Sequence, residues 1–132
     1  MASIWDNIKI KKGAGGVGDV TVEQKNSTIS NAVSVWTNMV LSEEQIAFGI
    51  ATMGVESGFN PAAQATTTAY GLGQFTNDTW AWAVSEYNRK FGGNLDPDQS
   101  RNDPTAQIAV MGAWIDKVWT MAQSVVNDPR LS

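Results

Sequence analysis

The chain has 132 residues, a formal net charge of −4, and neither cysteine nor histidine. This length suits a single domain with a hydrophobic core. Without cysteine there can be no disulfide or thiolate site, and without histidine the commonest transition-metal ligand and general base are missing, so we expect no metal site and no cofactor. The acidic balance leaves no basic face for a phosphate backbone, which argues against nucleic acid as a partner.

The first 26 residues differ in composition from the rest of the chain. KIKKGAGGVGDVTV combines a basic pair, a glycine cluster and a short alternation. We interpret residues 1–26 as a flexible N-terminal segment, either a tail or a hairpin. Gly13, Gly15 and Gly18 match the spacing of a dinucleotide-binding fingerprint, but DVTVEQ follows where the phosphate-binding helix should begin, which favours a flexible loop.

The next residues show the signals of two helices. Within residues 27–40, apolar side chains recur at helical spacing: Ile29, Val33 and Trp36. Ser42, with Gln45 three residues later, forms a capping box that begins the second helix. Ser57-Gly58 ends this helix, and the pair Asn60-Pro61 supports the break.

Two further helices complete a mainly α fold. We expect a third helix to begin at Asn77 or Asp78, with Asp78 as its N-cap. A closing helix begins with Asp103 as cap and Pro104 in its first position. Its apolar residues predict a long buried helix: Ile108, Met111, Ile115, Val118, Ala122 and Val125. Aromatic residues on helices are more often core than ligand contacts, so we assign most of the following to the core: Trp80, Trp82, Tyr87, Trp114 and Trp119.

One carboxylate, Glu56, stands at the end of the second helix. It shares a face with Gly49, Thr52 and Met53, and small side chains beside a carboxylate leave the room that the wall of a cleft requires. The carbonyl end of the helix dipole disfavours the charged form, and apolar neighbours act in the same direction. We therefore expect Glu56 to stay protonated near neutral pH. Taken alone, a solvated residue at a helix end is the commoner explanation.

A glycine-rich loop, Tyr70-Gly71-Leu72-Gly73-Gln74-Phe75, follows and can bring backbone close to a ligand. Together with ESGFNPAA, this loop resembles the goose-type lysozyme and soluble lytic transglycosylase family, in which Glu-Ser, a Phe-Asn-Pro-like segment and Gly-Leu-Met-Gln occur in this order. The matching residues are Glu56, Ser57, Phe59, Asn60, Pro61, Ala63, Ala69, Gly71, Leu72 and Gln74. The resemblance continues through LDPDQSRNDPTAQIAVMGAWI and covers residues 42–118. The chain departs from the family at Ala65, Thr68 and Gly73, and it has no counterpart of the family's last Ala-Tyr-Asn motif.

The resemblance implies a lysozyme-like domain over residues 27–132 that cleaves the MurNAc-β-1,4-GlcNAc bond of peptidoglycan. Glu56 would be the general acid and base. The expected substrate-binding residues are Ser57, Tyr70, Gly71, Leu72 and Gln74. In the family's transglycosylases the muramyl 6-hydroxyl replaces water and gives 1,6-anhydroMurNAc. No second acid is matched here, which favours a lyase over a hydrolase.

Three alternatives remain at this point: a hydrolytic lysozyme of the same fold, a non-catalytic wall-binding or assembly domain, and an enzyme that cleaves chitin. No stretch reads as a membrane span, and MASIWDNIKIKK lacks the apolar run of a secretory signal. This fits a bacteriophage protein, either an endolysin that passes from the host cytoplasm to the periplasm through a holin, or part of a larger virion or tail protein.

Overall fold

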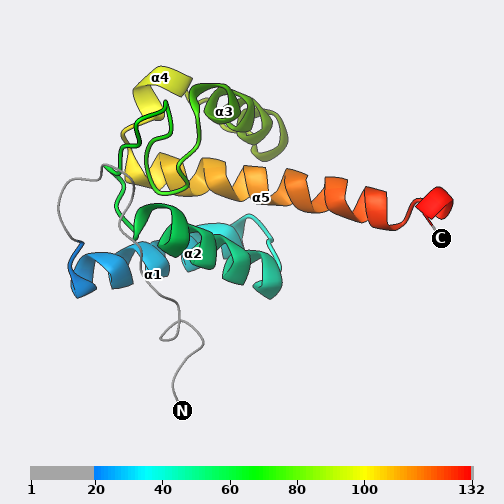
Figure 1. Ribbon diagram of the computed structural model, residues 1–132, viewed down its shortest axis with the longest axis horizontal. Coiled ribbons are helices and arrows are strands. Elements are labelled where there is room, and N and C mark those ends of the chain that lie inside the picture. The colour runs from blue at the N-terminus through cyan, green and yellow to red at the C-terminus, as the bar shows by residue number, and fades with distance from the viewer. Residues whose placement is uncertain (1–19, 132) are drawn as a thin grey trace, which may run out of the picture.

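The computed structural model describes residues 20–131, and these residues form helices joined by loops (Figure 1). The elements are α1 (Val22–Asn38), α2 (Glu43–Ser57), α3 (Asn77–Phe91), α4 (Pro97–Ser100), α5 (Pro104–Val126) and the 3-10 turn η2 (Pro129–Leu131). Within the described range, the only extended pairings are isolated bridges in the loop between α2 and α3. The predicted mainly α fold class is confirmed.

The first helix begins earlier than the sequence pattern predicted. It starts at Val22 because Thr21 is a well-formed N-cap, whose hydroxyl accepts from the amide of Gln24 at 3.1 Å. The side chain of Gln24 in turn accepts from the amide of Thr21 at 2.9 Å. Residues 22–26 therefore belong to α1 and not to a flexible segment. The glycines at positions 13, 15 and 18 lie outside the described residues.

Trp36 of α1 forms the centre of the core, where it contacts α2 and α5. Its side chain is fully buried, and its Nε1 donates a hydrogen bond of 2.8 Å to the carbonyl of Ile108 on α5. Two glycines let the neighbouring helices approach the indole closely. A Cβ added to Gly49 would lie 2.4 Å from the ring, and one added to Gly112 would lie 2.7 Å from it. The packing of α1, α2 and α5 thus depends on small residues opposite one large side chain.

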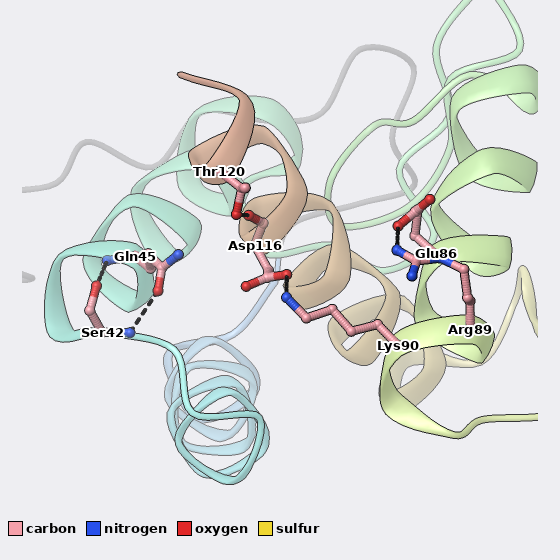
Figure 2. Close-up of polar contacts among 7 residues, drawn as sticks. All are labelled: Ser42, Gln45, Glu86, Arg89, Lys90, Asp116 and Thr120. Carbon is pink, nitrogen blue, oxygen red and sulfur yellow. Dashed lines mark hydrogen bonds and ion pairs between the residues drawn. The ribbon is translucent and has the colours of Figure 1, made fainter. Parts of the chain in front are cut away.

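Polar contacts on the surface support this arrangement (Figure 2). The predicted capping box of α2 is present, with the amide of Gln45 donating to Ser42 Oγ at 3.1 Å and Ser42 N donating to the Gln45 side chain at 2.7 Å. An ion pair between Lys90 of α3 and Asp116 of α5 joins the two helices that pack together most extensively.

The closing helix is buried over only part of its length. Asp103 caps α5 and Pro104 occupies its first turn, as predicted. The side chains from Ala106 to Ala113 and that of Ile115 are buried, whereas Val125 is 61% exposed. The predicted burial up to Val125 is wrong, because the second half of α5 extends beyond the other helices (Figure 1). Within the described part of the chain, no helix is long and apolar enough to span a membrane.

Candidate functional site

The elements that carry the candidate site meet at one end of the molecule. The C-terminal end of α2, the loop that follows it, and the first turns of α3 and α5 lie at this end (Figure 1). The loop spans residues 58–76, and we call it the α2–α3 loop. Its own hydrogen bonds, together with side chains from α5 and from the link before α5, hold it in place.

Glu56 lies in the last turn of α2, and its side chain is exposed. The helix ends as predicted at Ser57, because Gly58 adopts the left-handed conformation with φ of 59°. The amide of Gly58 donates to the carbonyl of Gly54 at 3.2 Å. The sequence predicted free room and apolar groups beside Glu56, but at Gly49 the ring of Trp36 fills the space. The carboxylate instead faces solvent, where a polymer can reach it.

Ser57 and Leu72, both predicted to bind substrate, are each 1% exposed. The hydroxyl of Ser57 donates a hydrogen bond of 3.0 Å to the carbonyl of Met53. Leu72 packs in the main hydrophobic core. Neither side chain presents a surface to a sugar in this arrangement, so their contribution is to hold the end of α2 and the α2–α3 loop.

Gln74 closes the tip of the α2–α3 loop. Its Nε2 donates to the carbonyls of Ala63 and Gly71, each at 2.9 Å. The backbone of Gln74 has a positive φ of 52°, which is uncommon for residues other than glycine, asparagine or aspartate. A residue keeps this strained conformation only where neighbouring contacts hold its backbone, and strained residues are common at ligand-binding sites. No hydrogen bond joins Gln74 to Glu56 within the described residues.

Gln107 of α5 also binds the α2–α3 loop, and the sequence pattern did not predict this role. Its side chain is 4% exposed. The Oε1 atom accepts from the amide of Leu72 at 2.8 Å, and Nε2 donates to the carbonyls of Pro61 and Arg101 at 3.0 and 2.9 Å. A Cβ on Gly71, whose φ is 82°, would lie 2.6 Å from the Gln107 side chain. The one available signal was a polar residue within the apolar stretch AQIAV.

Asp78 is not the N-cap of α3, contrary to the prediction. The helix begins at Asn77 and its N-cap is Thr76, with extended φ and ψ of −70° and 168°. Tertiary contacts fix Asn77 inside the helix: its amide donates to Thr68 Oγ1 at 3.1 Å, and its side-chain oxygen accepts from Arg101 at 2.7 Å. The Asp78 carboxylate is consequently exposed in the first turn of α3, and it makes no side-chain hydrogen bond to any described residue.

A row of aromatic rings runs from the α2–α3 loop along α2 and α5. The ring centroids of Phe75 and Trp114 are 5.3 Å apart, those of Trp114 and Phe48 are 6.2 Å apart, and those of Phe48 and Trp119 are 5.8 Å apart. Phe48 is 40% exposed, and Trp114 and Trp119 are half-buried against the core. We call these four residues the aromatic row. Phe48 precedes Glu56 on α2 by eight residues, which is about 12 Å along the helix axis.

The predicted assignment of the other aromatic residues to the core is correct in part. Trp80 is 3% exposed, and its Nε1 donates to the carbonyl of Pro97 at 2.7 Å. Tyr87 packs against the core, whereas Trp82 is 39% exposed. Tyr70, the expected sugar contact, is half-buried and lines a hollow beside the α2–α3 loop. Among residues 20–131, no group of three or more acidic side chains could hold a metal ion.

Comparison with known proteins gives one match. A family model described as phage tail lysozyme matches residues 27–125. This range begins within α1 and ends within α5, so it includes Glu56, the α2–α3 loop and the aromatic row. No curated protein and no solved structure matches the chain.

Proposed function

We propose that this chain, which belongs to the phage tail lysozyme family, degrades peptidoglycan by cleaving its MurNAc-β-1,4-GlcNAc bond, with Glu56 as general acid and base. The observation that carries the proposal is the place of Glu56 within the matched region. The only acid of the ESGFNP segment is exposed at a helix end, next to a loop held rigidly by Gln74 and Gln107.

The chemistry needs one acid that can also act as a base. Glu56 first protonates the glycosidic oxygen, and the leaving sugar departs with that proton while positive charge develops on the muramyl ring. The resulting carboxylate then removes the proton of the muramyl 6-hydroxyl, whose oxygen bonds to C1 and forms 1,6-anhydroMurNAc. The goose-type and lytic transglycosylase resemblance of Glu56-Ser57 and Gly71-Leu72-Gly73-Gln74 supports this assignment of reaction type.

The aromatic row supports sugar binding at the same site. Sugar rings present apolar C–H faces that stack on aromatic side chains, and a line of rings suits a linear polymer. Phe48 is exposed, and Trp114 and Trp119 are half-buried, whereas Phe75 is 8% exposed and supports the end of the row from within the core. Phe48 lies on the helix that ends at Glu56, and Phe75 directly follows Gln74. We therefore assign the glycan strand a path along the row, with Gln74 and Tyr70 beside the sugar nearest to Glu56.

Hydrolysis is the second candidate function, and one observation favours it. Asp78 does not cap α3 and is exposed in its first turn. This turn lies at the same end of the molecule as the C-terminal end of α2, which carries Glu56 (Figure 1). An inverting hydrolase needs a second carboxylate about 6.5–9.5 Å from the acid, to activate a water molecule. Asp78 is the candidate for this role.

For location, we propose a component of the phage tail in preference to an endolysin. The matching family is described by its occurrence in the tail, and an enzyme at that place would open the wall during infection. The chain would then act outside the host cell or in its envelope, with peptidoglycan glycan strands as its substrate.

The proposed function is tested by replacing the acid with its amide. Glu56→Gln keeps the shape of the side chain but cannot donate a proton, so we expect loss of cell-wall turbidity to slow by a factor of roughly 10²–10⁴. The matched control is Glu44→Gln, which removes an exposed glutamate from the first turn of the same helix. Circular dichroism should show both variants folded. Full activity of folded Glu56→Gln protein would contradict the proposal.

A further inference from the structure

A polar hollow of about 390 Å³ lies beside the α2–α3 loop. It is lined by residues of the loop, of the start of α3 and of the link before α5: Gln64, Thr67, Thr68, Tyr70, Asn77, Arg101 and Asn102. Every lining side chain carries a hydrogen-bonding group, and the only formal charge among them is that of Arg101.

Arg101 is held in a fixed orientation by neutral partners. Its Nη1 donates to Asn77 Oδ1 at 2.7 Å, and its Nη2 donates to the carbonyls of Thr68 and Phe75, both at 2.8 Å. The guanidinium carbon lies 5.8 Å from the ring of Trp80. None of these partners is a carboxylate, and the described residues contain no ion pair of Arg101. The positive charge is therefore positioned but not neutralised.

Burial makes this charge costly unless a ligand satisfies it. Partial burial lowers the pKa of Arg101, while Tyr70 and Asp98 act in the opposite sense, and the guanidinium stays charged throughout the physiological range. The Nε–H group is buried and has no hydrogen-bond partner among residues 20–131. A buried donor without a partner costs free energy, and such a group calls for a specific explanation.

The first turn of α3 adds partial positive charge to the same hollow. The hydroxyl of the N-cap Thr76 does not cap the helix but bonds to Thr79 Oγ1 at 3.4 Å, and the amide of Asn77 donates to Thr68 Oγ1. The next N–H groups of the first turn are therefore without a side-chain cap. Asn77, the first residue of α3, lines the hollow directly. A fixed guanidinium beside the start of a helix is an arrangement with which proteins bind anions.

We propose that this hollow binds a carboxylate, and that the carboxylate belongs to the stem peptide of peptidoglycan. This identification of the ligand rests on the proposed function. Three of the five N–H groups of Arg101 donate within the protein, so a carboxylate oxygen would accept a charge-assisted bond from one of the remaining two. The amide groups of Gln64 and Asn102 can pair with a peptide backbone. Tyr70 belongs both to the hollow and to the loop beside Glu56. The glycan and its peptide would thus both contact the α2–α3 loop.

The test compares two soluble probes that differ in one group: muramyl-L-alanyl-D-isoglutamine, with a free carboxylate, and its C-terminal amide. We expect the Glu56→Gln protein to bind the acid roughly tenfold more tightly than the amide, as a charge-assisted contact requires. In ¹H–¹⁵N spectra, the acid alone should shift the Arg101 Nε–H and the side-chain amides of Asn77 and Asn102. Equal affinity for both probes, or shifts confined to the aromatic row, would overturn the proposal.

Asn102→Asp provides a variant that leaves the bonds of Arg101 in place. It puts a negative charge into the hollow, so preference for the acid should disappear. Asn94→Asp is the matched control: it makes the same change at an exposed asparagine outside the hollow and should retain the preference. An unchanged preference in Asn102→Asp would overturn the assignment to this hollow. The binding test does not depend on catalysis. If the unmodified protein preferred the acid but did not cleave peptidoglycan, the carboxylate site would be supported and only the proposed enzymatic function would be contradicted.

Discussion

A single amide side chain decides how the candidate site is held. Gln107 satisfies the amide of Leu72 and the carbonyls of Pro61 and Arg101 in an interior where water cannot replace it. A buried polar group stabilises the folded state when all its hydrogen-bond partners are present, and removing one partner lowers the stability. The rigidity of the α2–α3 loop, and with it the position of Gln74, therefore depends on α5.

We expect Gln107→Leu to lower the free energy of unfolding by roughly 2–5 kcal/mol, because it leaves several buried backbone groups without partners. Chemical denaturation measures this change. Gln123→Leu, at an exposed position of the same helix, is the control and should change the stability by less than about 0.5 kcal/mol. Similar stabilities for the two variants would mean that Gln107 does not hold the loop.

Gly71 combines two constraints that can be separated by experiment. Its φ is 82°, and a Cβ would lie 2.6 Å from the Gln107 side chain, whereas Gly92 has a φ of 70° with nothing within 4 Å. Both Gly→Ala changes incur the cost of left-handed backbone, about 1–2 kcal/mol. Only Gly71→Ala adds a clash, typically about 1–3 kcal/mol. Thermal unfolding should show the larger loss for Gly71→Ala; equal losses would refute the close contact with Gln107.

At the residue scale, the sequence predicts that Glu56 lies at a helix end because an acid beside a helix-ending Ser-Gly pair is a local pattern, and its catalytic role stays a prediction. It did not identify Gln107 or Arg101. Their importance comes from partners far along the chain, such as the contact between Gln107 and Leu72, and no local pattern records such partners. The sequence also could not show that Ser57 and Leu72 face the interior, since motif membership does not fix the direction of a side chain.

At the scale of elements, helix ends were predictable where one residue had the chemistry of a cap. Ser42 with Gln45 and Asp103 with Pro104 are such cases. The start of α3 at Asn77 was predicted, but its N-cap was wrongly assigned to Asp78, because several neighbouring residues can cap a helix and tertiary bonds to Asn77 select among them. Burial along α5 was overestimated, because periodicity gives the apolar face of a helix but not how far its neighbours extend.

The capping box at the start of α1 gives a test at this scale. Thr21→Ala removes the side chain that accepts from the amide of Gln24, so we expect a loss of about 0.5–2 kcal/mol in the free energy of unfolding. Thr37→Ala, an exposed position near the other end of α1, is the control and should have little effect. No loss in Thr21→Ala would indicate that residues 22–26 contribute little to the domain, as the sequence first suggested.

At the scale of the whole molecule, the arrangement brings together parts that the sequence separates widely. Glu56, the tip of the α2–α3 loop and the first turns of α3 and α5 lie at one end (Figure 1). The aromatic row extends from this end toward the exposed half of α5, where Trp119 lies. The sequence predicts the helices that carry these groups, but their relative placement follows from packing around Trp36, which depends on Gly49 and Gly112.

The type of reaction is decided by the whole site, because it depends on whether a second acid acts with Glu56. If the muramyl 6-hydroxyl is the acceptor, digestion should give muropeptides that end in 1,6-anhydroMurNAc and are lighter by one water than hydrolysis products. Asp78→Asn should then retain activity and lose less than about 1 kcal/mol of stability, since only an interaction with the helix dipole is removed. Mass spectrometry of the products and turbidity assays measure both. Reducing-end products alone, with activity abolished in a stable Asp78→Asn protein, would establish instead that Glu56 and Asp78 form the acid and base of a hydrolase.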